Sequence, residues 1–131
     1  MFSDCIQLSN INPLKNWNVS SGTYFKYMFK SDSKIDNINP LENWDFSHLL
    51  DLEGFFSGLT DLTDLTPIQN WNVSKCQNFK SLFSNCQKIS DLTPLKDWNV
   101  SNGIIFSNMF YGCFSIIDIK PLENWNVSKG V

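Results

Sequence analysis

The sequence of 131 residues contains no alanine and no arginine, and it has a single histidine. Without arginine, the chain has no planar guanidinium group for bidentate binding of phosphate or carboxylate. Charged residues make up only 18% of the chain and the net charge is -3, so a basic surface that would bind nucleic acid or an anionic membrane is absent. No apolar run approaches the ~18 residues of a membrane span, and the first residues lack the pattern of a signal peptide. We therefore expect neither nucleic-acid binding nor direct membrane insertion.

The dominant feature that is present is an internal repeat of 27 residues without insertion or deletion. The residues that follow this spacing are Trp17, Trp44, Trp71, Trp98 and Trp125; Pro13, Pro40, Pro67, Pro94 and Pro121; and Phe2, Phe29, Phe56, Phe83 and Phe110. Repeats of this length are typical of solenoids, in which each coil stacks on a copy of itself. The repeat predicts one domain, residues 1–131, built from about five coils. Below, a column means the residues at one repeat position in successive coils.

Each coil is expected to contain one short helix and one short strand, which makes the fold class α/β. In the fourth copy, Phe79, Leu82, Phe83 and Cys86 have the spacing of one helix face, so a helix is expected over 79–86. Gly54 is expected to loosen the equivalent helix in the third copy. The apolar stretch before each proline reads as a strand that the proline ends. The strands expected to form a parallel sheet are 8–11, 35–38, 62–65, 89–92 and 116–119.

The tryptophan column allows two interpretations. It could form a buried stack, or it could form an exposed aromatic platform for sugars. No copy replaces tryptophan by a polar residue, and an apolar residue follows two positions later in every copy. This pattern favours a core in which each indole N–H donates to a nearby carbonyl.

The repeat resembles the leucine-rich repeat of BspA-like surface proteins of bacteria. The residues that carry the resemblance are Asn70-Trp71-Asn72-Val73-Ser74, the Phe79…Leu82-Phe83…Cys86 segment, and Ile89…Leu92…Leu95. The resemblance covers the whole chain. It implies a right-handed leucine-rich-repeat-like solenoid, a location at the cell surface or outside the cell, and a role in adhesion or protein binding. It implies no catalytic residues. The sequence departs from the pattern where Asp32 and Leu59 occupy the position of Cys86 and Cys113.

Cysteine and histidine show no spacing typical of a metal site or of a catalytic nucleophile and base. Cys86 and Cys113 lie on the apolar face of the expected helices, so buried free thiols are favoured over a disulfide between them. His48 occupies a column filled elsewhere by Ser21, Lys75, Asn102 and Lys129, which indicates an exposed site. We expect no enzyme activity, no cofactor and no metal.

Two further columns carry side-chain oxygens. Asp64, Asp91 and Asp118 share a column with Asn10 and Asn37, which favours side chains that hydrogen-bond the backbone of a turn over a row of calcium ligands. A second column of asparagines belongs to Asn-x-Ser triplets that match the N-glycosylation pattern: Asn18, Asn72, Asn99 and Asn126. Asp45 replaces asparagine in the second copy, so a hydrogen-bonding role in a turn is favoured here too.

In a solenoid, binding specificity resides in outward positions that vary between copies. The positions that we predict to form a binding face are Ser9, Asp36, Thr63, Ser90 and Ile117, together with Asn12, Asn39, Thr66, Thr93 and Lys120. The predicted function is a non-enzymatic module that presents this extended face to a protein or cell-surface ligand. The alternative is a structural spacer or assembly segment of a longer solenoid, because neither end of the chain carries a polar cap and head-to-tail self-association would cover both ends.

Overall fold

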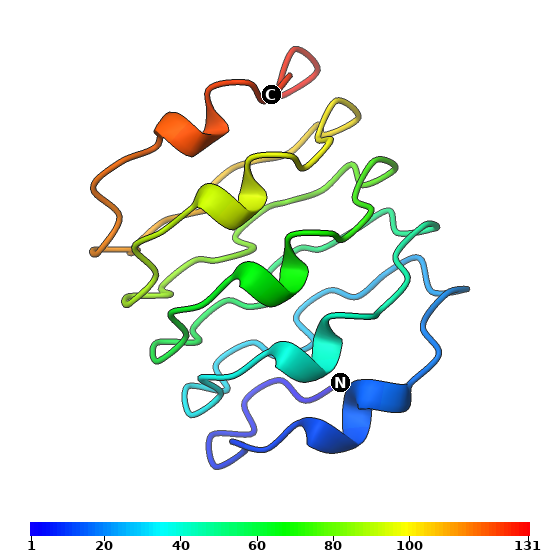
Figure 1. Ribbon diagram of the computed structural model, residues 1–131, viewed down its shortest axis with the longest axis vertical. Coiled ribbons are helices and arrows are strands. Elements are labelled where there is room, and N and C mark those ends of the chain that lie inside the picture. The colour runs from blue at the N-terminus through cyan, green and yellow to red at the C-terminus, as the bar shows by residue number, and fades with distance from the viewer.

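A computed structural model describes residues 1–131 as a single stack of five coils (Figure 1). Each coil contains one short 3-10 helix, and the five helices line up along one side of the stack. Their bounds are η1 Asn12–Asn16, η2 Asn39–Leu41, η3 Thr66–Ile68, η4 Thr93–Leu95 and η5 Lys120–Leu122. The starts of successive helices are 27 residues apart, so the predicted repeat of one coil per 27 residues is confirmed. None of the 3-10 helices has the length or the hydrophobicity that a membrane span requires.

The 3-10 helices form where the strands were predicted to end. In η3, Pro67 lies in the first turn. Its fixed φ suits a helix, and an N–H at this position would have no acceptor within the helix, so proline costs no hydrogen bond here. The residue before η3, Leu65, has φ -98° and ψ 0°, which is not extended backbone. The predicted strands over 8–11, 35–38, 62–65, 89–92 and 116–119 are therefore wrong. The apolar residues at the two ends of these segments, such as Leu62 and Leu65, are the inward-facing residues of an irregular segment.

Parallel pairing occurs at a different position in the coil. Isolated parallel bridges join Tyr24 to Asp51, Asp51 to Asn78, and Asn78 to Ile105. No longer strand extends from these bridges. The fold therefore keeps the parallel register between coils that the repeat predicts, but only one residue per coil forms a bridge.

The helix predicted over 79–86 is also wrong, because the backbone there does not keep helical dihedral angles. Ser81 has φ 54° and Asn85 has φ 61°, whereas every residue of an α-helix needs φ near -63°. The N–H groups of Phe79, Ser81 and Phe83 donate to carbonyls of the next coil at 2.8, 3.0 and 2.9 Å. The alternate N–H groups of Leu82 and Ser84 bond three residues back. This alternation satisfies the backbone without forming a helix.

The left-handed residues form two columns in this segment. One column contains Asp4, Ser31, Gly58, Asn85 and Gly112, and the other contains Tyr27, Gly54, Ser81 and Asn108. Gly54 has φ 60° and therefore suits its position rather than loosening a helix.

The aromatic columns form the centre of one hydrophobic core that runs through the stack. Successive rings of the phenylalanine column, from Phe2 to Phe110, are nearly parallel, with centroids 5.6 to 6.4 Å apart. The indoles of Trp44, Trp71 and Trp98 are buried, and their N–H groups donate to backbone carbonyls of the preceding coil at 3.0 to 3.1 Å. The prediction of a buried tryptophan column is confirmed for these coils.

Candidate binding face

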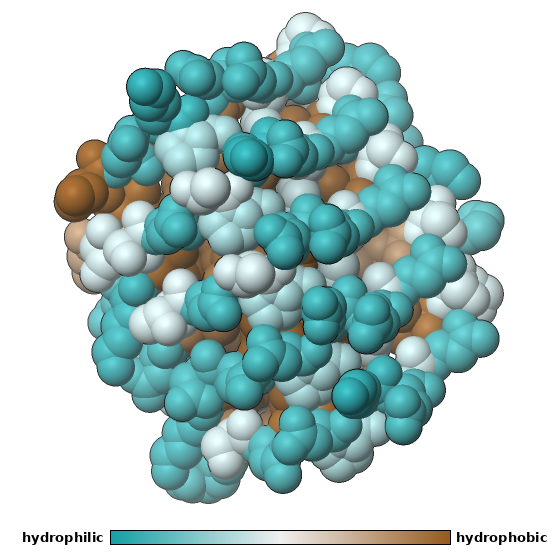
Figure 2. Space-filling view, in the orientation of Figure 1, coloured by the Kyte–Doolittle hydropathy of each residue, from teal (hydrophilic) through white to brown (hydrophobic).

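The ten residues predicted to form a binding face are all exposed. Five of them begin the 3-10 helices and the other five lie three residues earlier in each coil, so both columns follow the helix side of the stack. Figure 2 shows this side: hydrophilic side chains run in rows along the coils, with hydrophobic surface visible between the rows. The predicted residues therefore share one face of the molecule.

Two shallow hollows bring some of these residues together. One hollow of about 310 Å³ is lined by Asp36, Asn37, Ile38, Asn39 and Asp64, so it joins two predicted residues to a second carboxylate. Another, of about 300 Å³, includes Thr93 and Lys120 with the charged side chains of Lys96, Asp118 and Glu123. The predicted residues that line neither hollow are Ser9, Asn12, Thr63, Thr66, Ser90 and Ile117. Since neither hollow is a deep apolar pocket, the face suits polar contacts over a broad area.

The carboxylate column on this face supports the turn that precedes each 3-10 helix. Oδ1 of Asp64 and of Asp91 each accepts a hydrogen bond of 2.8 Å from the backbone N–H two residues later. Asn10 and Asn37 accept the same bond in the first two coils. The hydrogen bonds from Thr93 lower the pKa of Asp91. The prediction that these side chains hydrogen-bond their local backbone is confirmed, and no three His, Cys, Asp or Glu residues converge on a common point in the chain.

The Asn-x-Ser triplets form turns of the same kind. Oδ1 of Asn72 accepts hydrogen bonds from the N–H of Ser74 at 3.2 Å and from its hydroxyl at 2.7 Å. Asp45 accepts the equivalent backbone bond from Ser47 at 2.8 Å. The predicted hydrogen-bonding role of this column is therefore confirmed.

Three of the four cysteines are buried free thiols: Cys76, Cys86 and Cys113. Burial raises the pKa of Cys76 to about 12 and also raises the pKa of Cys86, whose thiol donates to the carbonyl of Phe56 at 3.1 Å. A thiol that stays protonated is a poor nucleophile and a poor metal ligand. The free buried thiols agree with the sequence prediction, and His48 is exposed, as its column predicted.

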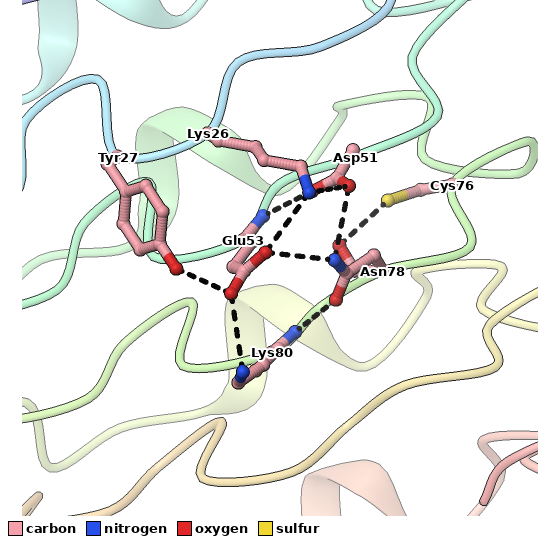
Figure 3. A network of polar contacts seen from close by, with 7 residues as sticks. All are labelled: Lys26, Tyr27, Asp51, Glu53, Cys76, Asn78 and Lys80. Carbon is pink, nitrogen blue, oxygen red and sulfur yellow. Dashed lines mark hydrogen bonds and ion pairs between the residues drawn. The ribbon is translucent and has the colours of Figure 1, made fainter.

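The sequence analysis missed a polar network on the bridge-bearing side of the coils (Figure 3). Asp51 and Glu53 are buried, yet Nζ of Lys26 lies 3.0 Å from Oδ2 of Asp51 and 3.2 Å from Oε2 of Glu53. Nζ of Lys80, from the following coil, lies 3.5 Å from Oε1 of Glu53. Asn78 donates to Oδ2 of Asp51 at 3.1 Å. The network joins three successive coils.

The network holds Glu53 in its ionised form. The hydroxyl of Tyr27 donates to Glu53, and this bond, together with Lys26 and Lys80, lowers the pKa of Glu53 to about 2 despite its burial. A carboxylate that is always ionised near neutral pH is poorly suited to exchange protons with a substrate. The two carboxylates and two ammonium groups also balance in charge. A signal for the network was present, because one column alternates Lys26, Glu53 and Lys80.

Comparison with known proteins assigns the chain to a family. The family model described as "Mycoplasma protein of unknown function, DUF285" matches residues 1–39 and 32–131. The chain belongs to the DUF285 family. Among solved structures, the DUF285 chain has a weak likeness to internalin C2 of Listeria monocytogenes strain 4b F2365, with 17% identity and a TM-score of 0.29. This alignment covers 95% of the DUF285 chain but only 65% of the internalin, and it is too weak to support an argument about fold or function. No curated protein matches the DUF285 chain.

Proposed function

We propose that the chain is a non-enzymatic repeat module that binds a protein ligand, through the helix side of its coils, at a cell surface or outside the cell. The observation that carries this proposal is the contrast between inward and outward columns. The tryptophan column is invariant, whereas the exposed column that begins with Ser9 also contains Asp36, Thr63 and Ile117. Inward residues are constrained by packing between coils, whereas outward residues are free to vary between coils and can supply ligand contacts. The resemblance to BspA-like repeats supports the same role in adhesion.

The binding mechanism relies on a face that is ordered before the ligand arrives. The side chain of Asp64 fixes the turn before η3, and the equivalent residues do so in every coil. A preorganised face loses less conformational entropy on binding. Affinity then comes from shape and polar contacts along several coils, with no cofactor.

The two hollows differ in the charged residues that line them, so the two parts of the face are not equivalent. The hollow that contains Asp36 and Asp64 presents two carboxylates and no lysine. In the hollow near η5, Lys96 and Lys120 lie beside the carboxylates of Asp118 and Glu123, so the charges there balance. We propose that a ligand places a basic side chain in the first hollow. Electrostatic complementarity of this kind fixes orientation and raises the association rate more than it raises affinity.

The test is a binding screen of the purified chain against immobilised extracellular-matrix and plasma proteins, followed by matched variants. Asp36→Lys and Asn39→Lys change the first hollow. Ser107→Lys adds the same single charge as Asn39→Lys at an exposed residue outside both hollows. We expect at least ~10-fold weaker binding for the first two variants and unchanged binding for the third. Equal loss in all three variants, or no binding to any of these proteins, would contradict the proposal.

A further inference from the structure

Asp32 lies at the contact between the first and second coils, in a column that otherwise holds thiols and a leucine. The other residues of this column are Cys5, Leu59, Cys86 and Cys113. Asp32 is fully buried, and its Oδ1 accepts the backbone N–H of Cys5 at 2.7 Å. Its Oδ2 is the one buried side-chain oxygen in the chain without a hydrogen-bond partner. One oxygen of this carboxyl group is therefore satisfied and the other is not.

The thiols of the same column show which group a side chain at this position can reach. The thiol of Cys86 donates to the carbonyl of Phe56, 30 residues earlier, at 3.1 Å. Cys113 makes the equivalent bond at 3.0 Å, again to the carbonyl 30 residues earlier. The same step from Asp32 leads to the carbonyl of Phe2, which accepts one backbone hydrogen bond of 3.1 Å and has a lone pair for a second. The column therefore places a carboxyl oxygen where a hydrogen-bond donor is needed.

The protonation state of Asp32 determines whether this second bond can form. An ionised carboxylate only accepts hydrogen bonds, so Oδ2 and the carbonyl oxygen of Phe2 are then two acceptors without a donor. A protonated carboxyl group supplies one O–H, which can donate to Phe2 as the thiols do to their carbonyls. Oδ1 meanwhile still accepts the N–H of Cys5. Only the protonated form can satisfy both oxygens.

The surroundings of Asp32 favour this form. Burial raises its pKa to about 6, although the backbone hydrogen bond from Cys5 acts in the opposite direction. Two charged groups face Asp32 from the first coil: Asp4 raises the pKa, and the amino group of Met1 lowers it. From the third coil, the neighbouring residue of the column is Leu59, which carries no charge. Asp32 therefore changes its charge at a pH where most aspartates are already ionised.

We propose that Asp32 is a proton-sensitive switch in which the protonated Oδ2 donates to the carbonyl of Phe2 and closes the contact between the first and second coils. Loss of the proton breaks this bond and leaves an unpaired charge inside the contact. The backbone bonds that report on the contact are those from the N–H groups of Phe2 and Asp4, which donate to Met28 and Lys30 at 2.8 and 2.7 Å. The switch does not depend on ligand binding at the helix side.

Hydrogen exchange measured by nuclear magnetic resonance tests the switch in the 131-residue chain. The contribution of Asp32 to stability is complete below its unfolded pKa of 3.8 and is lost as the pH rises through about 6. Between about pH 5 and about pH 7.5 we expect the amides of Phe2 and Asp4 to lose protection ~10-fold, after correction for the intrinsic exchange rate. The amides of Gly54 and Phe56, which donate to the next coil at 2.8 and 3.0 Å, are the reference. The carbon resonance of the Asp32 carboxyl group, followed over the same range, identifies the group that titrates.

Two substitutions of Asp32 separate its charge from its role as a donor. Asp32→Asn can donate from Nδ2 to Phe2 and accept from Cys5 at every pH, so we expect protection that does not change with pH. Asp32→Leu copies the third coil and removes both the charge and the donor. We expect it to be independent of pH as well, but with several-fold lower protection of Phe2 than Asp32→Asn. Near-ultraviolet circular dichroism checks that both variants fold.

His48 needs its own control, because histidine also changes charge near neutral pH and Nδ1 of His48 lies 3.1 Å from the carbonyl of Ser20 in the first coil. His48→Asn copies Asn102, which donates to the equivalent carbonyl at 2.8 Å. We expect this variant to keep the pH dependence of the wild type. Equal protection of the wild type at both pH values, or titration of Asp32 near its ordinary pKa, would overturn the proposal. It would also fail if the pH dependence persisted in Asp32→Asn or disappeared in His48→Asn, or if Asp32→Asn and Asp32→Leu were equally protected.

Discussion

At the scale of single residues, Asp32 is the clearest conflict between a side chain and its environment. Its column otherwise contains Cys5, Leu59, Cys86 and Cys113, and Asp32 is fully buried. Oδ1 accepts the N–H of Cys5 at 2.7 Å, but Oδ2 has no hydrogen-bond partner. Burial raises the pKa of Asp32 to about 6. A buried oxygen without a partner costs about 1–3 kcal/mol, so Asp32 destabilises the fold at neutral pH.

This conflict predicts a stabilising substitution with a defined pH dependence. The raised pKa means that Asp32 favours folding below its unfolded pKa of 3.8 and that this contribution is lost as pH rises through 6. Asp32→Cys, which copies the residue of the fourth and fifth coils, is expected to raise the free energy of unfolding by about 1–3 kcal/mol at pH 7. The gain shrinks toward pH 4. Urea titrations at both pH values measure it, and an equal gain at both would show that the charge of Asp32 is not the cause.

The tryptophan column predicts a large loss on truncation in the middle of the stack. Trp71 is buried and its indole N–H donates to the carbonyl of Leu41. Trp71→Ala is expected to lower the free energy of unfolding by about 3–5 kcal/mol, because it leaves a cavity and an unpaired carbonyl site. Trp17→Ala is the matched control, and we expect a smaller loss because Trp17 is half-exposed and makes no such bond. Denaturant midpoints compare the two variants. An unchanged midpoint for Trp71→Ala would show that Trp71 does not contribute to the core.

At the scale of elements, the repeat gave the register but misassigned the local structure. Phe79, Leu82, Phe83 and Cys86 do face the core as predicted, because alternating turns bury side chains at positions that also fit one face of a helix. Apolar spacing alone does not distinguish these two backbones. The missing information lay in the backbone: four of the five residues in one left-handed column are Asp, Gly or Asn, which tolerate left-handed φ better than most residues, and the fifth is Ser31.

The left-handed columns predict that residue type matters more than size at these turns. Gly58 has φ 83°, and Asn85 occupies the same column with φ 61°. Gly58→Val is expected to lower the free energy of unfolding by about 1–3 kcal/mol, because a β-branched residue is strained at this φ. Gly58→Asn, which copies the fourth coil, is expected to cost less. Both variants add a Cβ near Ser31, so the difference between their thermal midpoints isolates the backbone effect, and equal losses would indicate a clash instead.

At the scale of the whole molecule, stacking determines which parts of the site were predictable. The columns of tryptophan, phenylalanine and carboxylate residues follow from a repeat in which each coil meets a copy of itself. The Lys26–Glu53–Lys80 network does not follow from identity between copies, since it depends on alternation of charge between neighbouring coils. The hollows around Asp36 and Lys120 also lie where copies differ, and neighbouring side chains define their shapes.

Stacking also predicts how stability is distributed along the chain. A solenoid is stabilised by contacts between neighbouring coils, so its end coils open more easily than its middle coils. The N–H groups of Leu52, Gly54 and Phe56 donate to the next coil at 2.9, 2.8 and 3.0 Å, whereas those of Phe110 and Gly112 have no acceptor. At low protein concentration we expect slow hydrogen exchange at the first three amides and fast exchange at the last two. Exchange measured by nuclear magnetic resonance tests this gradient, and uniform protection along the chain would show that the stack unfolds only as a whole.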